Sequence, residues 1–385
     1  MSMWQIIQRE GRQCLKDPRR LVFLFGAAIA YLLVFGVLYM PNIVKDIPCV
    51  IYDEEQTQLS RALVRAFEDS DSFRVTGYTD SQEAMQTALR DKTAYAAIHI
   101  PRDFSRKVKT GSAGTVLFMV NGSNIILTNI TSSAAQDIIA EFSNKVAAKN
   151  AALRLGANEQ LLAKKIAPVS CHLRVLDNET QGYTYFFLLG LAMVAFQQGI
   201  FFAVGASVLY EYENYEAGLS AWKLLTVKIL FYWILSMLSF SMVVLMVEKL
   251  WGILLKAPLT QLFLLGGVFS LAAISFCLLA ASLFHTEMQF VRAAIMYPVP
   301  AFIFSGYTWP MESMSPLLQS MAQFFPLSWL SNTVRELFLS GQSIHYAHSL
   351  MALSIMAVVC LLFVNFTFVH GRKRAASLQE QTAES

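Results

Sequence analysis

Charged side chains are missing from most of this chain, and their distribution limits what it can fold into. The first uncharged run, 21–40, is long enough to cross a bilayer, since about 20 apolar helical residues span a hydrocarbon core of about 30 Å. Charge-rich sequence follows over 41–182, and the remainder, 183–369, is again almost continuously apolar. The sequence therefore predicts an α-helical integral membrane protein with a water-soluble domain inserted between its first and second helices.

The composition agrees with a membrane protein. The 385-residue chain is 55% hydrophobic and only 15% charged, whereas soluble domains carry about 25% charged residues. The 41–182 segment contains 16 basic and 16 acidic residues. Because neither sign dominates there, we expect no nucleic-acid partner. Membrane lipid is the expected environment of the apolar half.

Basic residues flank the first and last apolar runs. Arg19 and Arg20 precede the first run, and Arg372 follows the last. Such flanks are retained in the cytoplasm, so we expect cytoplasmic termini, an even number of spans and an extracytoplasmic 41–182 domain. We predict a cytoplasmic interface helix in 1–20, six spans at 21–40, 183–208, 224–247, 260–284, 292–311 and 347–369, and a cytoplasmic tail over 370–385.

The inserted segment alternates between short β-rich runs and helical stretches. Strands are expected at 48–52, 73–78, 95–100, 115–121 and 169–176, and helices at 56–68, 81–90 and 101–107. This alternation predicts an α/β domain, a sheet with crossover helices. Apolar residues then recur at three- and four-residue spacing from Leu127 to Val146, which indicates an amphipathic helix. It is either one long helix that reaches about Lys165 or two shorter helices that break at Gly156.

Two of the five cysteines lie in the inserted domain. Cys49 and Cys171 stand near its two ends. An oxidising compartment permits a disulfide between them, and the alternative is two buried thiols that pack as small apolar side chains.

Motifs for chemistry are absent from the sequence. No G-x-x-x-x-G-K-[ST] phosphate loop, H-E-x-x-H helix, C-x-x-C pair or G-x-S-x-G elbow occurs, and these motifs position phosphates, zinc, redox thiols and nucleophilic serines. The histidines are scattered. We therefore predict no catalytic residue, no bound cofactor and no metal site, and a protein that is not an enzyme by itself.

Ionisable side chains are rare within the predicted spans. Ion-coupled carriers keep costly ionisable groups at mid-membrane depth, so any transport here is expected to be driven from elsewhere. Lys228 and Glu248 lie near span ends, where we expect them to reach water. Gln197 and Gln198 either face a transport path or form hydrogen bonds between helices, and the packing role is the favoured interpretation.

Two segments are suited to receiving an external drive. Over Trp4–Leu15, apolar side chains fall on one helical face, which predicts an interfacial amphipathic helix at the cytoplasmic surface. That predicted face consists of Trp4, Ile7, Gly11, Cys14 and Leu15. The 209–223 loop combines three acids with aromatic residues; because aromatic residues are enriched at protein contacts, docking of a partner at this loop is the favoured interpretation. The alternative for this loop is a solvated turn with aromatic belt residues.

Several motifs together carry a resemblance to a known family. They are Arg9-Glu10, Lys16-Asp-Pro-Arg-Arg20, Ala97-Ile-His-Ile-Pro-Arg-Asp-Phe104, the block from Phe304 to Met314, Phe325-Pro-Leu-Ser328 and Arg335-Glu336. With them the chain resembles, over nearly its whole length, the ABC-2 type permeases (type V exporter fold), in the drug-efflux-like subgroup with a large external domain. The family's E-x-E-x-G-T-L-E link is matched only by Glu211, Glu213 and Gly218, because the Thr-Leu-Glu portion is missing.

The resemblance implies a permease subunit of an ATP-driven exporter in the bacterial inner membrane. Partner ATP-binding subunits would hold ATP and Mg, and a second permease copy or a paralogue would complete the pore. A periplasmic membrane-fusion adaptor is a further expected partner. The residues expected to couple the chain to the ATPase are Arg9, Glu10, Glu211, Glu213, Glu216, Trp222 and Lys228.

The resemblance also implies a fifth span followed by re-entrant external helices near 312–340. Pro298 and Pro300 interrupt that span, and such breaks are tolerated where neighbouring helices satisfy the freed carbonyls. They would let the Ser305–Arg335 segment dip partly back into the outer leaflet as a gate. The expected path and gate residues are Gln197, Gln198, Pro298, Pro300, Ser305 and Pro310.

Two other functions fit the same layout. In the first, the chain is a membrane-anchored receptor or secretion scaffold whose external domain binds a partner and through which nothing passes. In the second, it is a lipid or polysaccharide exporter permease, although such permeases usually lack a large domain between the first two spans.

Overall fold

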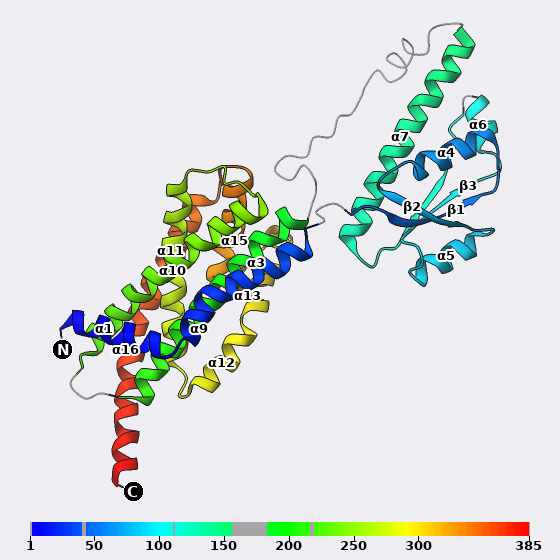
Figure 1. Cartoon of the computed structure of the whole chain (residues 1–385). Coiled ribbons are helices and arrows are strands. Elements are labelled where there is room, and N and C mark those ends of the chain that lie inside the picture. Colours follow the sequence, from blue (N-terminus) through cyan, green and yellow to red (C-terminus); the bar gives the residue numbers. More distant parts are fainter. Residues whose placement is uncertain (1, 41–43, 111, 156–182, 216–218, 385) are drawn as a thin grey trace. The chain divides into compact units, whose positions relative to one another are not determined.

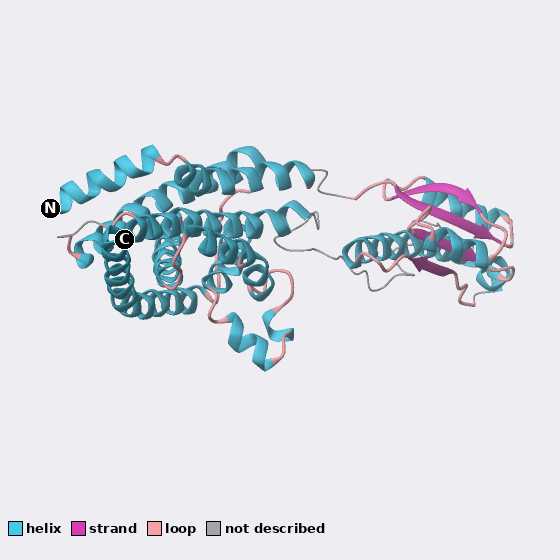
Figure 2. Cartoon of the chain, turned by 90° about the horizontal axis from the view of Figure 1, so that it is seen from below, coloured by secondary structure: helices cyan, strands magenta, loops and turns pink. Residues whose placement is uncertain are grey.

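The computed structural model describes residues 2–40, 44–110, 112–155, 183–215 and 219–384. The chain divides into two compact units, one formed by Met1–Asn42 with Val175–Ser385 and the other by Ile43–Arg174. The first unit is built of helices, and all strands in the described residues belong to the second (Figures 1 and 2).

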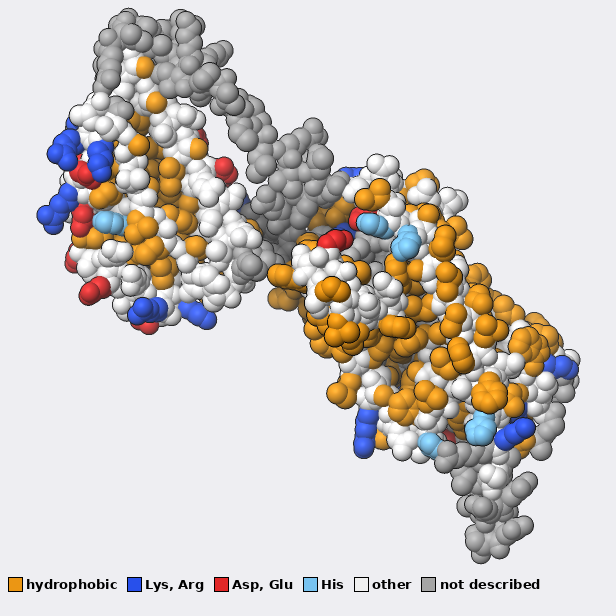
Figure 3. All heavy atoms as spheres, turned by 180° about the vertical axis from the view of Figure 1, so that it is seen from behind, with side chains coloured by type: hydrophobic (Ala, Val, Ile, Leu, Met, Phe, Trp, Pro, Cys, Tyr) orange, Lys and Arg blue, Asp and Glu red, His pale blue; other side chains and the backbone are white. Residues whose placement is uncertain are grey.

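Among the described residues of the first unit, five helices are long and apolar enough to cross a membrane. They cover Arg19–Leu38, Thr184–Glu213, Ala221–Trp251, Leu259–Ser282 and Tyr346–Lys373. The elements are α1 (Met3–Lys16), α2 (Arg19–Leu21), the π-helix η1 (Val22–Gly26), α3 (Ala27–Leu38), α9 (Tyr183–Glu213), α10 (Ala221–Trp251), α11 (Leu259–Ser282) and α16 (Tyr346–Glu384). Hydrophobic side chains cover the visible face of this unit (Figure 3), as expected for a surface in contact with lipid.

The predicted fifth span, 292–311, is not one continuous helix. The structure has α12 (Glu287–Met296) and α13 (Pro298–Phe304) instead, separated at Tyr297. Pro298 and Pro300 lack the backbone N–H groups that would continue the ladder of α12. The chain then continues through η2 (Met311–Ser313), α14 (Pro316–Ala322) and α15 (Pro326–Leu339). The count of six spans therefore stays a prediction.

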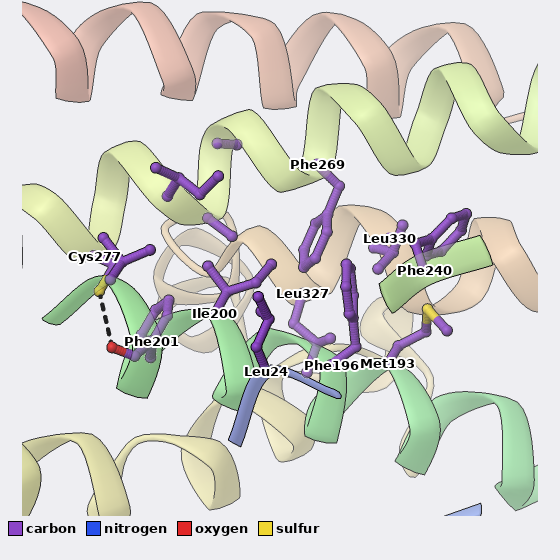
Figure 4. Close-up of a cluster of buried hydrophobic side chains, with 14 of the residues drawn as sticks. Leu24, Met193, Phe196, Ile200, Phe201, Phe240, Phe269, Cys277, Leu327 and Leu330 are labelled. Atoms are coloured by element: carbon purple, nitrogen blue, oxygen red, sulfur yellow. Dashed lines mark hydrogen bonds between the residues drawn. The ribbon is translucent and has the colours of Figure 1, made fainter. Parts of the chain in front are cut away.

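Helix α9 is the central helix of the first unit. In its most apolar stretch, 78% of the residues are buried, compared with 33% in that of α10 and 28% in that of α16. Phe196 of α9 packs against Phe240 and Phe269, with ring centroids 5.5 and 6.0 Å apart (Figure 4). A Cβ atom at Gly199 would lie 2.6 Å from the carbonyl oxygen of Phe23. Only glycine therefore permits the close approach of α9 to η1.

In its described residues, the second unit is a four-stranded sheet covered by helices. The strand order is β2-β1-β3-β4, in which β1 is parallel to both neighbours and β4 is antiparallel to β3. The elements are β1 (Ile47–Asp53), α4 (Gln58–Glu68), β2 (Phe73–Tyr78), α5 (Gln82–Arg90), β3 (Ala96–Ile100), α6 (Phe104–Thr110), β4 (Leu117–Val120) and α7 (Ile125–Leu155).

Helix α7 is one continuous helix of 31 residues, which corresponds to about 46 Å at 1.5 Å per residue. Leu127, Ala135, Ile138 and Phe142 pack on the core between the sheet and α4. The predicted extension to Lys165 and the alternative break at Gly156 lie outside the described residues.

The predicted strand at 169–176 and Cys171 also lie outside the described residues. Cys49 is fully buried in β1, and burial raises the pKa of its thiol to about 12. The predicted disulfide stays a prediction.

A buried ionic cluster as the candidate functional site

Helix α1 brings an acidic side chain into the protein. Ser2 and Gln5 form a capping box at its start, in which the Gln5 N–H donates to Ser2 Oγ at 3.3 Å and the Ser2 N–H donates to Gln5 Oε1 at 2.9 Å. Residues four apart share one helical face, and Ile6, Glu10 and Cys14 are the buried residues of α1. The docked face of α1 therefore has a carboxylate at its centre.

The set of residues predicted to form the buried face of α1 was wrong, since of that set only Cys14 is among the buried residues. Trp4 is 66% exposed and Leu15 is also exposed, whereas Glu10 is completely buried. An assignment by apolarity places an acid on the outer face. In the structure a specific partner satisfies Glu10, so the face that contains it turns inward.

That partner is Lys228 on α10. The Lys228 ammonium donates to Glu10 Oε2 at 2.8 Å and to Ser207 Oγ at 2.6 Å. Ser207, on α9, donates in turn to Glu10 Oε1. All three side chains are buried, with Lys228 only 1% exposed. One ion pair and one hydroxyl therefore join α1, α9 and α10.

More charged groups surround this centre. Arg9 donates to Glu211 Oε1 at 2.8 Å, and Lys228 Nζ lies 3.5 Å from the same oxygen. Arg20 Nη1 lies 3.8 Å from Glu10 Oε1, and its Nε donates to Asp17 Oδ2 at 3.3 Å.

The hydroxyl of Tyr232 completes the contacts of Glu10. It donates to Glu10 Oε1 at 3.2 Å and accepts from Arg20 at 3.5 Å. We define the ionic cluster as Arg9, Glu10, Asp17, Arg20, Ser207, Glu211, Lys228 and Tyr232. Three cations face three carboxylates in it, so its formal charge is balanced.

The carboxylate of Glu10 is held in its charged form. Burial acts to raise the pKa of Glu10, but the attraction of Lys228, hydrogen bonds from Lys228 and Ser207 and the charge of Arg20 outweigh it and lower the pKa. Removing one partner of such a buried pair leaves an uncompensated charge, at a cost of about 3–5 kcal/mol. The cluster therefore ties α1 firmly to the helices that it touches.

Four of the residues expected to couple the chain to an ATPase meet in this cluster: Arg9, Glu10, Glu211 and Lys228. The expectation that Lys228 reaches water was wrong, because Glu10 and Ser207 replace its hydration.

The other three coupling residues lie elsewhere. Glu213 lines a neighbouring cavity, Trp222 is exposed, and Glu216 lies outside the described residues.

Sequence reasoning did not single out Ser207 and Tyr232, and it used Arg20 as a topology signal and as part of the Lys16–Arg20 motif, without assigning it to the site. A helical spacing could have found two of them. Ser207 lies four residues before Glu211, and Tyr232 lies four residues after Lys228, so each shares a helical face with a predicted site residue.

The link between α9 and α10 is held by the last helix. Arg372 of α16 donates to the carbonyl oxygen of Leu219 at 2.7 Å, and its guanidinium lies 5.1 Å from the ring centroid of Tyr215. Tyr212 packs against Phe368 with ring centroids 5.8 Å apart. The α9–α10 link therefore contacts the C-terminal helix just beyond the cluster.

The two glutamines predicted within the second span join α9 to the broken helix. Gln197 donates to the hydroxyl of Tyr297 at 2.8 Å, and Gln198 donates to the carbonyl oxygen of Ala294 at 2.7 Å. These contacts are interhelical hydrogen bonds at the break between α12 and α13.

Two of the predicted gate residues, Ser305 and Pro310, lie along the turn that follows α13, whereas Pro298 and Pro300 lie within α13. The hydroxyl of Ser305 donates to the carbonyl oxygen of Phe302 at 2.6 Å, and Pro310 directly precedes η2. Asn332 of α15 donates to the carbonyl oxygen of Ser305 at 3.2 Å. A side chain of α15 therefore holds the C-terminal end of α13.

The chain matches known transporter proteins over most of its length. The family described as "ABC-2 family transporter protein" matches residues 19–365. The probable multidrug ABC transporter permease YbhR of Escherichia coli (strain K12) is 21% identical over 352 residues, which cover 89% of this chain and 91% of YbhR. The linearmycin resistance permease protein LnrN of Bacillus subtilis (strain 168) is 23% identical over 384 residues, 93% of this chain and 95% of LnrN.

The family implies a separate ATP-binding subunit as a partner. The family match, the apolar helices and the two full-length relatives together place this chain in the ABC-2 transporter family, as a membrane-spanning permease.

Proposed function

We propose that this chain is the permease subunit of an ATP-driven exporter of small lipophilic molecules. In this proposal, separate ATP-binding subunits drive the permease, and the ionic cluster transmits their movement to the membrane helices. The observation that carries the proposal is the triad of Glu10, Ser207 and Lys228. It fixes a surface helix to α9, the most buried of the candidate spans. A displacement of α1 is therefore passed to the core of the membrane domain.

The proposed partner surface combines the outer face of α1 with the α9–α10 link. Trp4 of α1 and Trp222, at the start of α10 beside this link, are exposed, and aromatic residues are enriched in protein interfaces. The ATP-binding subunits supply ATP and Mg. Cytoplasmic termini, residues 41–182 on the far side of the bacterial inner membrane, a second permease copy or paralogue and a periplasmic adaptor complete the proposal.

The test measures ATP hydrolysis by any ATP-binding subunit whose gene neighbours that of this chain, in lipid nanodiscs, with and without the permease. We expect the permease to change the hydrolysis rate by about fivefold or more, a typical size for coupling between two sites. Glu10→Gln should still bind the subunit but lose this effect. Lys249→Gln is the matched control, because Lys249 is an exposed residue of α10 outside the cluster.

A rate that is indifferent to the permease, or to Glu10→Gln, would contradict the proposal. The former result would favour the receptor or scaffold function. The exporter of lipid or polysaccharide remains the other alternative, and the 132-residue second unit, Ile43–Arg174, speaks against it.

A further inference from the structure

The turn that follows α13 inserts an aromatic ring into a notch on α9. The ring belongs to Tyr307, which is buried. A Cβ atom at Gly190 of α9 would lie 2.6 Å from a carbon of that ring, so any larger residue there would push the ring out. Gly306, directly before Tyr307, has a φ of 74°, a left-handed conformation that glycine adopts without strain. Both glycines therefore serve to place this one ring against α9.

The guanidinium of Arg335 covers the ring from α15. Its Cζ atom lies 4.6 Å from the ring centroid of Tyr307 and 5.2 Å from that of Phe186. Phe186 belongs to the beginning of α9, and its ring lies 5.8 Å from that of Tyr307. The face of an aromatic ring attracts a cation. One side chain of α15 therefore joins the turn after α13 to α9.

This contact lacks the ion pairs that hold the other end of α9. Within the described part of the chain, Arg335 has no carboxylate partner. Its Nη1 atom and the Oδ1 atom of Asn332 are buried, and no described residue forms a hydrogen bond with either. Buried polar atoms without partners are unfavourable, and water would satisfy both if the turn moved away from α9. The attraction of two rings outweighs this cost by a small margin, so the turn is closed but opens readily.

We propose that Arg335 is the positioning residue that keeps the turn from Ser305 to Pro310 closed on α9, and that release of Arg335 opens the membrane unit at this end. Helix α9 also carries Ser207 of the ionic cluster. Gly190 precedes Ser207 by 17 positions, which corresponds to about 26 Å along the helix. One helix thus has the coupling contact near one end and the closing contact near the other. This inference rests on the proposed export function and names the contact that closes the predicted gate.

The experiment measures the alkylation rate of a cysteine at position 305 (Ser305→Cys) by a membrane-impermeant maleimide. It uses the full-length permease in nanodiscs, with all five native cysteines replaced by serine or alanine and without any ATP-binding subunit. Ser305 is completely buried, so the reaction requires the turn to move. Arg335→Gln should raise the rate at least about fivefold, the effect of losing a desolvated cation–π contact. Arg292→Gln removes an exposed arginine of α12 and is the matched control, which should leave the rate unchanged.

Two further measurements separate a closing contact from a general loss of stability. Phe186→Leu should raise the rate by a smaller factor, and its combination with Arg335→Gln should add little, because both changes remove the same contact. The Tm in detergent should stay nearly constant in Arg335→Gln, whereas a merely structural role would lower it. An unchanged alkylation rate in Arg335→Gln, fully additive effects in the double variant, or a rate that rises only together with a large fall in Tm overturns the proposal. Because no ATPase is present, a failure of ATPase coupling leaves this result intact.

Discussion

The ionic cluster predicts how firmly α1 is docked. Either Glu10→Leu or Lys228→Met leaves the other charge buried without its partner. The expected cost is about 3–5 kcal/mol for each single change. Since every 1.4 kcal/mol changes an equilibrium constant tenfold, the detached fraction of α1 should rise between about 100-fold and about 4,000-fold.

Cys14 reports this detachment directly. Its side chain lies on the same face as Glu10 and is buried, and burial raises the pKa of its thiol. The thiolate is the nucleophile that adds to maleimide, so the reaction should require α1 to leave its site. In a chain whose other four cysteines are replaced by serine or alanine, the alkylation rate then follows the detached fraction.

The double variant Glu10→Leu/Lys228→Met is the decisive arm. Replacing both partners of a buried pair with apolar residues is often neutral or stabilising. We therefore expect the double variant to be alkylated more slowly than either single variant, with a coupling energy of about 2 kcal/mol or more. Single variants that react at the rate of the parent chain, or costs that simply add, would refute the assigned role of the pair.

Three other perturbations test the packing and the charges. Gly199→Ala should destabilise the membrane unit by about 1–3 kcal/mol, because its Cβ atom would meet the carbonyl oxygen of Phe23. Gly26→Ala, whose Cβ atom would make only ordinary contacts, should not destabilise it. Thermal unfolding in detergent compares the two variants. The pKa of Glu10 in the folded protein is lowered from its usual value of 4.5. The charged carboxylate therefore stabilises the folded state above pH 4.5, and this stabilisation is lost as the pH falls through the pKa of the folded state. The difference in Tm between the parent and Glu10→Gln should shrink over the same pH range. Arg372→Gln removes a charged hydrogen bond worth about 1.5–3 kcal/mol and should increase proteolysis at the α9–α10 link. An unchanged cleavage rate would show that α16 does not hold this link.

Much of the second unit follows from local sequence. The strands at Phe73–Tyr78 and Ala96–Ile100 were expected within one residue of their observed bounds. Short β-rich runs separated by capped helices carry enough local information for this. Ser81 caps α5 by accepting from the Ala84 N–H at 3.2 Å, and such caps are visible in sequence.

The membrane unit was harder to predict, for two physical reasons. Proline breaks a helix, but sequence does not fix where the chain turns afterwards, so the predicted fifth span became α12 and α13. Burial of Lys228 depends on Glu10, 218 residues away, and no local pattern reports that pairing. The resemblance to permeases named these residues, whereas only the structure shows that they touch.

The sequence distance between the partners of the ionic cluster sets an order of assembly during synthesis. Glu10 emerges from the ribosome long before Lys228, and its carboxylate must stay hydrated until the hairpin of α9 and α10 is inserted, because burial without a cation is unfavourable. The contact of Arg372 with Leu219, 153 residues earlier, forms later still. The first helix to be made is thus among the last to reach its final place, and a nascent chain arrested before residue 228 should carry it undocked.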